Sequence, residues 1–428
     1  MMLSLPHDSI MKQSNKLSGQ PIIGQLFSFI PSDIIKQAVS EFNSDYYYKT
    51  LTTKKQLAFL LYGVVTRCRS LNNLCKNLIF LDNKLMYLGI NKLPAVSTLS
   101  DANINRSSEV FGKIYLLLYQ YYKHDLSDSF AQFFTQKEVD ASKVILFDAT
   151  TIGLFVDIFK GAGRNPIDGR KKGGLKIQAT MPLDGSVPDV IHLHPASKND
   201  KTFLGQLNHP KGTIYVFDKG YVNYTKYEEW TQQGVFYVTR PNTNASYQVV
   251  ERKLHNIIDY AAGGVIKEEI ILLNLSEDKQ HKARLITYKD PLSNNILEFI
   301  SNMNDCSALT ITLLYKCRWN MEVLFKQLKQ NFELSNFYSD STEGIKTQIW
   351  IALIANLLFT VIHKRIKESE QFITLVNMAS NNMGSYVCLI SIFNCKKLTE
   401  QERDLEKIQL NLFEISGGGV FQKNEKSP

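Results

Sequence analysis

The pattern of apolar and polar positions changes twice along this 428-residue chain. Over residues 22–123, apolar side chains recur every three or four positions and show no strand-like alternation, most clearly at residues 54–66 and 110–122. This spacing predicts an all-helical N-terminal part. Within it, residues 97–101 follow Pro94 and offer Ser, Thr and Asp side chains suited to capping the start of a helix.

The second pattern begins after Lys143, where residues 144–147 form a wholly apolar run that ends at Asp148. A short apolar run of this kind is typical of a buried central strand. Further runs predict strands at residues 175–181, 187–193, 213–217 and 235–239, with helices at 201–207 and 224–233. Strands that alternate with helices indicate an α/β sheet.

A polar and strand-like stretch, residues 241–305, then separates this sheet from a second helical region. Runs at residues 269–274 and 283–288 predict strands, so the stretch reads as a β-rich insertion. Helical spacing returns over residues 308–332 and 344–366.

Composition narrows the class of protein only modestly. The chain is 44% hydrophobic and 21% charged, as in an ordinary folded protein, and its net charge of +8 suits a polyanionic partner. The six cysteines form no CxxC pair, so neither a zinc site nor a disulfide framework is predicted. The apolar run at residues 350–362 is interrupted by Asn356 and is too short to span a bilayer, which predicts a buried helix and no membrane partner.

Two aspartates stand directly after predicted strands, Asp148 after residues 144–147 and Asp218 after residues 213–217. Hard divalent cations prefer oxygen ligands, and phosphodiester cleavage by two such ions needs carboxylates that converge from separate elements. Neighbouring strand ends would place the two groups well. Taken alone, either aspartate is more often a turn or helix-capping residue.

The segment 314–332 predicts a helix with two distinct stripes. Its apolar stripe would pack on the sheet. The other stripe spans roughly 80° at 3.6 residues per turn and places one carboxylate among a phenol and three cations, which suits a phosphate backbone near metal ions. It consists of Tyr315, Arg318, Glu322, Lys326 and Lys329. The alternative is an i,i+4 ion pair between Arg318 and Glu322, with lysines that only solvate an exposed face.

The spacing Tyr315-x2-Arg318-x3-Glu322-x6-Lys329 resembles the C-terminal signature of the insertion sequence four family of bacterial DDE transposases, at all four positions. The resemblance extends to two other blocks of that family. Asp148 is followed by Ala-Thr, and Asp218 is followed by Lys-Gly-Tyr, with lysine where the family often has arginine.

This resemblance implies a ribonuclease-H-like core with a β-strand insertion between the second aspartate and the glutamate. It implies that Asp148, Asp218 and Glu322 bind two Mg²⁺ ions, with Mn²⁺ as an alternative, and that the cationic stripe, including Lys326 and Lys329, holds DNA. The implied partners are double-stranded DNA, as terminal inverted repeats and as target, and a second copy of the chain in a homodimer. The implied setting is the bacterial cytoplasm, on the nucleoid.

The predicted architecture therefore has four parts. They are a helical DNA-binding domain at residues 1–140, a ribonuclease-H-like α/β core at 141–240 and 306–370, a β-rich insertion at 241–305, and a helical C-terminal region with a flexible tail at 371–428.

Several weaker features leave alternatives open. His192 and His194 would share one strand face, where they either contribute to a metal site or, with no third ligand nearby in sequence, are partly buried or face phosphate. The glycine- and lysine-rich segments 160–164 and 170–174 predict a hairpin that lies on DNA or a solvated turn, and their glycines complete no nucleotide-binding motif. Trp319 would stack on an extruded base or simply pack at the surface.

Other functions share part of this pattern. A nuclease without strand transfer would use the same three acids, whereas a silent DNA-binding derivative would have no need to keep all of them. A carbohydrate hydrolase would also need paired acids, but the cations around Glu322 do not fit it.

Overall fold

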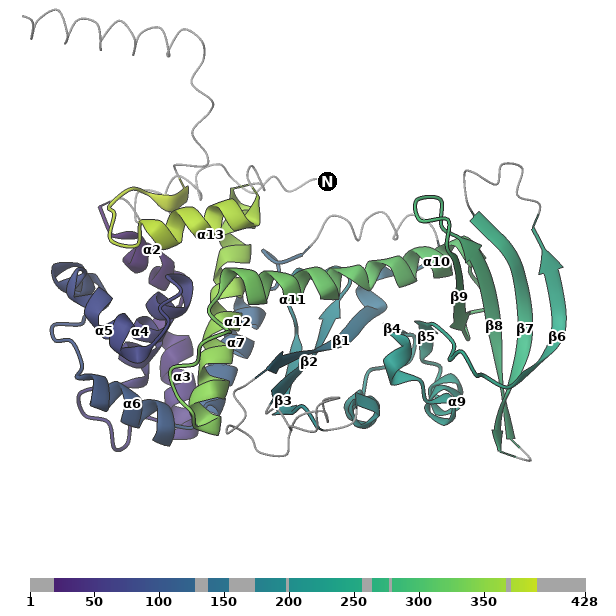
Figure 1. Ribbon diagram of the computed structural model, residues 1–428, viewed down its shortest axis with the longest axis horizontal. Helices are drawn as coiled ribbons and strands as arrows, with labels where there is room; N and C mark the ends of the chain where they lie inside the picture. Colours follow the sequence, from purple (N-terminus) through teal and green to yellow (C-terminus); the bar gives the residue numbers. More distant parts are fainter. Residues whose placement is uncertain are drawn as a thin grey trace, which may run out of the picture.

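The computed structural model describes residues 19–127, 138–153, 174–197, 200–255, 264–276, 279–366 and 371–390. A block of helices lies at one end of the molecule, and a long mixed sheet extends from it to the other end (Figure 1). Two helices in line, α10 and α11, run along the sheet towards the helical block. The α/β class expected from the sequence is therefore confirmed. The predicted hairpin segments 160–164 and 170–173 and the tail beyond residue 416 lie outside the described residues.

The helical block combines helices from residues 22–122 with two helices from near the C-terminus. Its α-helices are α2 (Ile22–Ser28), α3 (Ser32–Phe42), α4 (Thr53–Val65), α5 (Leu71–Ile79), α6 (Val96–Asn105) and α7 (Glu109–Tyr122), with a 3₁₀ helix, η1, at Asp82–Leu88. The two strongest periodic stretches are thus confirmed as α4 and α7. The predicted cap at residues 97–101 is wrong, because α6 already begins at Val96 and Ala95 before it has no side chain to donate or accept.

The helix α12 (Thr342–Arg365) lies along the side of this block that faces the sheet (Figure 1). It packs against α4, α6, α7 and α13 (Phe372–Asn381). Gly112 of α7 allows a close approach, since a Cβ there would stand 2.9 Å from the Trp350 ring. By length and composition α12 could cross a membrane, but 94% of its most apolar window is buried inside the protein. The prediction of a buried helix over residues 350–362 is confirmed.

The described strands form one nine-stranded sheet in the order β3-β2-β1-β4-β5-β9-β8-β7-β6. Among the described strand pairs, only β1–β4 and β4–β5 are parallel. The strands are β1 (Val144–Gly153), β2 (Gly174–Pro182), β3 (Val190–Pro195), β4 (Ile214–Val216), β5 (Phe236–Thr239), β6 (Tyr247–Leu254), β7 (Gly264–Ser276), β8 (Lys279–Lys289) and β9 (Ile296–Ser301). Strands β6 to β9, which come from the predicted insertion, thus extend the sheet that starts with β1.

Several predicted elements need correction. β1 does not end at Asp148 but continues to Gly153, paired with β2 alone. Residues 201–207 form a 3₁₀ helix, η3 (Asp200–Gln206), whereas residues 224–233 do form the helix α9 (Tyr224–Gln232). The helix expected over residues 314–332 is divided, with α10 (Ala308–Cys317) and α11 (Trp319–Asn331) separated at Arg318.

The two faces of the sheet bury different side chains. On one face, aliphatic residues such as Leu146 and Val216 join the large core shared with α10, α11 and α12. On the other, a smaller and mostly aromatic core includes Phe147 and Phe217, whose rings stack with centroids 4.5 Å apart. Successive residues of β1 and β4 therefore point into different cores, as strand geometry requires.

Candidate active site

The register of the parallel strands brings Asp148 and Asp218 side by side. β1 and β4 pair from Val144↔Ile214 to Leu146↔Val216, and the same register places Asp148 beside Asp218 two residues further on. Side chains two positions apart share a face, so both aspartates lie on the side of Leu146 and Val216 that α10 and α11 cover. Two acids from distant parts of the chain thus meet beneath one pair of helices.

The junction of α10 and α11 places a phenol, a guanidinium and the third acid against these aspartates. The hydroxyl of Tyr315 donates to Asp218 Oδ1 over 3.2 Å. Arg318 Nη2 lies 2.6 Å from Glu322 Oε1, and its Nη1 lies 3.6 Å from Asp148 Oδ2. Each of the three acids is therefore tied to Tyr315 or Arg318.

The break between the helices sets this geometry. Arg318 keeps right-handed helical angles, φ −53° and ψ −28°, and both ends α10 and precedes α11. Glu322 consequently lies in the first turn of α11, where unpaired N–H groups favour a negative charge. Exposure of the side chains rises from 18% at Asp148 to 36% at Glu322, so the site opens towards Glu322.

Burial and neighbouring charge disturb the titration of this site. Burial raises the pKa of Asp148 from 3.8 to about 6, and the charges of Asp218 and Glu322 add to that rise. The backbone N–H of Ala149 and the charge of Arg318 oppose it. An acid with a raised pKa amid two others marks a place where negative charge is under-compensated.

The donor chemistry of the site fits a hard divalent cation, because its three acids offer only carboxylate oxygens. Within the ranges that the structure describes, however, no three Asp, Glu, His or Cys side chains lie close enough to hold one ion as they stand. Arg318 contacts both Asp148 and Glu322. In the observed arrangement the guanidinium of Arg318 thus lies between Asp148 and Glu322.

The lysines of the predicted stripe lie further along α11. Lys329 Nζ donates to the Thr151 carbonyl of β1 over 3.1 Å, and burial lowers its pKa. Lys326 is exposed. Of the five residues in the stripe, three therefore meet at the aspartates, whereas Lys329 contacts β1 beyond Asp148 and Lys326 faces solvent.

Arg240 is a residue that the sequence reasoning missed. Arg240 follows β5 directly, and Asp218 lies two residues after the end of β4. Both residues therefore lie at the same edge of the parallel strands. Its charge lowers the pKa of Tyr315, although burial dominates and raises that pKa to about 12. A basic residue directly after the predicted strand 235–239 was the signal available in the sequence.

The histidine pair and Trp319 make other contacts. His194 Nε2 is 2.6 Å from Gln178 Oε1, and the His192 ring lies edge-on to Phe203 with centroids 5.5 Å apart. Among the described residues, no third metal-binding side chain joins this pair. Trp319 is 61% exposed, next to Arg318 on α11.

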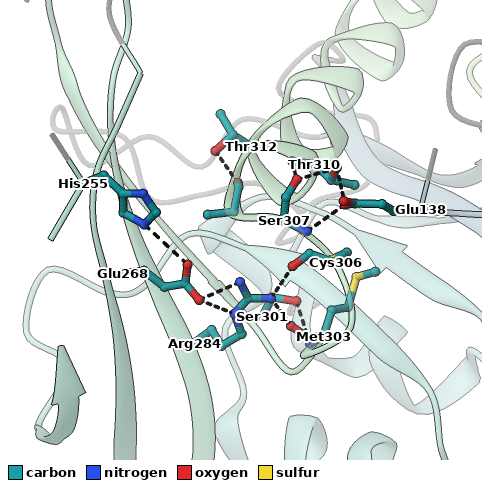
Figure 2. Close-up of polar contacts among 11 residues, drawn as sticks. Glu138, His255, Glu268, Arg284, Ser301, Met303, Cys306, Ser307, Thr310 and Thr312 are labelled. Carbon is teal, nitrogen blue, oxygen red and sulfur yellow. Dashed lines mark hydrogen bonds and ion pairs between the residues drawn. The ribbon is translucent and has the colours of Figure 1, made fainter. Parts of the chain in front are cut away.

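The start of α10 is fixed to the sheet by a buried arginine, shown in Figure 2. Arg284 of β8 donates from Nε and Nη2 to Glu268 of β7, and from Nη1 to the carbonyls of Met303 and Cys306 over 2.6 and 2.9 Å. Glu138 accepts from the backbone N–H of Ser307 and from Thr310 on the other side of the same turn. These contacts link the strands of the predicted insertion to the helix that carries Tyr315.

We expect Arg284→Met to lower the free energy of unfolding by ~2–3 kcal/mol, since it leaves two carbonyls without this donor and leaves the partly buried Glu268 with only the longer contact to His255, at 3.8 Å. Urea unfolding of the full chain measures the effect. Arg252→Met is the matched control: its side chain is 56% exposed, and its partner Glu269 keeps Lys267 at 2.9 Å. Equal losses in the two variants would contradict a specific role for the buried arginine.

Comparison with protein families gives two matches. Residues 140–358, about half of the chain, match the family described as "Transposase DDE domain". Residues 18–91 match a "Domain of unknown function (DUF4372)". The first match contains all the residues of the site described above.

Relatives of known name are also similar. The protein y4zB of Sinorhizobium fredii, named as a transposase, is 26% identical over 63% of this chain and 71% of its own length. Proteins named as transposases of IS5377 from Geobacillus stearothermophilus and of IS4SA from Synechocystis sp. are 21% and 22% identical, over 55% and 71% of their lengths. A chain of the piggyBac transposase synaptic complex with hairpin DNA is 9% identical, with 91% of this chain and 85% of that chain covered. The TM-score of 0.41 is too low to establish a common fold.

Proposed function

Because the chain belongs to the transposase DDE-domain family, we propose that it cuts and rejoins DNA strands at the ends of an insertion sequence, in a metal-dependent reaction. The convergence of Asp148 and Asp218 with Glu322 from the far side of the insertion carries this proposal. A structural ion pair between Arg318 and Glu322 would not need two further acids beside it.

The three acids would hold two Mg²⁺ ions, or Mn²⁺ in their place, which would activate a water or 3′-hydroxyl and stabilise the leaving oxygen. Arg318 would then release Asp148 and Glu322 and donate to a phosphate instead. Its Nε is buried and, among the described residues, has no hydrogen-bond partner, which supports a second position for this side chain. Tyr315, Lys326 and Lys329 would hold neighbouring phosphates.

The proposed architecture is a ribonuclease-H-like core interrupted by a β-rich insertion. Support comes from the strand order β3-β2-β1-β4-β5, in which the antiparallel β1–β2–β3 unit continues into parallel β4 and β5. We assign residues 1–140 to DNA binding, 141–240 and 306–370 to the core, 241–305 to the insertion and 371–428 to a helical C-terminal region.

The proposed partners follow from the reaction. Double-stranded DNA would be bound as two terminal inverted repeats and as the target, and a homodimer would hold the two ends together. The net charge of +8 favours such a polyanion. The setting would be the bacterial cytoplasm, on the nucleoid.

The test uses the purified full chain and a DNA fragment that contains its coding sequence with both flanks. In Mg²⁺ we expect cuts at defined positions on each side of the coding sequence, and in EDTA none. Joining of the cut ends to an added plasmid would separate a transposase from a nuclease. Cutting that persists in EDTA would contradict the metal-dependent mechanism, and binding without cutting would favour the silent DNA-binding alternative.

A further inference from the structure

A short loop between α3 and α4 presents two aromatic rings to solvent. Tyr46 is 75% exposed and Tyr47 is 86% exposed, and their rings meet edge to face with centroids 4.6 Å apart. Large rings this exposed lose the favourable burial that usually accompanies an aromatic side chain. Two exposed rings together on one loop indicate a surface that binds another molecule.

The base of the loop is held by one buried arginine. Arg106, which is 2% exposed, donates from Nε to the Ser44 carbonyl over 3.1 Å and from Nη2 to the Leu51 carbonyl over 2.8 Å. Its guanidinium also lies 3.9 Å from the centre of the Tyr48 ring. One side chain thus fixes both ends of the loop, so the exposed rings are presented by a preorganised support.

The loop's one acid is used inside this support. Asp45 Oδ1 accepts from the Thr53 backbone N–H over 2.6 Å, from the Thr53 hydroxyl over 2.7 Å and from Arg106 over 3.3 Å. Lys49 and Lys54, by contrast, are exposed. The loop therefore exposes two phenol rings and the Lys49 cation, and Lys54 is exposed in the first turn of α4.

The charge of the surrounding domain favours a nucleic acid over another protein. Residues 18–91 contain eight lysines and arginines against four aspartates and glutamates. Aromatic rings beside basic side chains are the combination with which proteins bind unpaired bases and their backbone. A ring pair also suits insertion where a duplex is opened or kinked.

We infer that Tyr46, Tyr47 and Lys49 form a DNA-binding tip, in which the rings pack on bases at an opened or kinked duplex end and Lys49 binds the adjacent phosphate. This inference rests on the proposed function and gives a role to a segment within the match to a domain of unknown function. The tip is separate from the acidic site, to which it contributes no residue.

The test measures binding of the full chain to two short fluorescein-labelled probes from the DNA that flanks the coding sequence, one fully paired and one with an unpaired end. We expect the double variant Tyr46→Ala, Tyr47→Ala to bind the unpaired-end probe at least about tenfold more weakly, the loss typical of removed base stacking. The double variant with Phe at both positions keeps the rings and should stay within about threefold. Lys49→Glu should lower the slope of log affinity against log salt by about one.

Tyr121→Ala is the matched control, because Tyr121 is 61% exposed on α7 and also lies edge-on to a neighbouring ring. It should bind like the wild type. Unchanged affinity in the Ala double variant, with wild-type cutting in Mg²⁺, overturns this inference alone, as does a smaller oligomer at unchanged DNA affinity, which would make the tip a contact between copies. A wild type that neither binds nor cuts overturns the proposed function as well.

Discussion

Replacement of Glu322 by glutamine is expected to slow metal-dependent DNA cleavage by roughly a thousand-fold or more, because a lost metal-binding charge removes several kcal/mol of transition-state stabilisation. The fold should survive. Glu322 is 36% exposed, and glutamine can still accept the hydrogen bond that Arg318 donates over 2.6 Å. Single-turnover cleavage of the flanking DNA in Mg²⁺, with binding measured on the same probe, separates lost chemistry from lost affinity.

Glu109→Gln provides a closely matched control. Glu109 also lies in the first turn of a helix, α7, and is exposed, so the substitution changes the same charge at the same type of position. We expect no more than a severalfold change in cleavage. If Glu322→Gln cleaved within about tenfold of the wild type, Glu322 would not be a metal ligand and the Arg318–Glu322 pair would be structural.

The two aspartates could be found from the sequence because each follows an apolar run that predicts a buried strand of the sheet. Apolar runs of similar length precede Asp148 and Asp218. Because the two strands pair in parallel, the aspartates that follow them lie side by side. The strand beyond Asp148 gave no such signal. Residues 149–153 pair with β2 and, apart from the buried Ile152, are at least partly exposed, so they carry little of the apolar pattern that marks a strand.

Other features depend on contacts that no local pattern encodes. Every residue of β6 is exposed, and a bulge between Val249 and Glu251 breaks its alternation, so it was missed. The division of the long helix at Arg318 was equally hidden, because the residues on both sides of it have helical spacing. The hydrogen bonds of Arg284 join β8 to a turn about twenty residues later in the sequence. Only the folded sheet brings these two segments together.

A second large effect is expected from Asp148→Asn, this time on stability. In the folded protein the pKa of Asp148 is raised from 3.8 to about 6, chiefly by burial. Because its pKa is raised in the folded protein, this carboxyl lowers the free energy of unfolding progressively as the pH rises from about 4 to 6. Above that range the full loss of stability remains. At pH 8 in EDTA, the neutral asparagine should therefore make the protein more stable than the wild type by up to about 3 kcal/mol.

Urea unfolding at several pH values measures this difference, with Asp33→Asn as the control because its side chain is 88% exposed and forms a surface ion pair with Lys36. The Asp148→Asn advantage should vanish as the pH falls below about 3, where the wild-type carboxyl is protonated in both the folded and unfolded states. Added Mg²⁺ or Mn²⁺ should stabilise the wild type and not the variant. An advantage that is constant from pH 4 to pH 8, or a variant that is less stable at pH 8, would show that burial of the Asp148 charge carries no such cost.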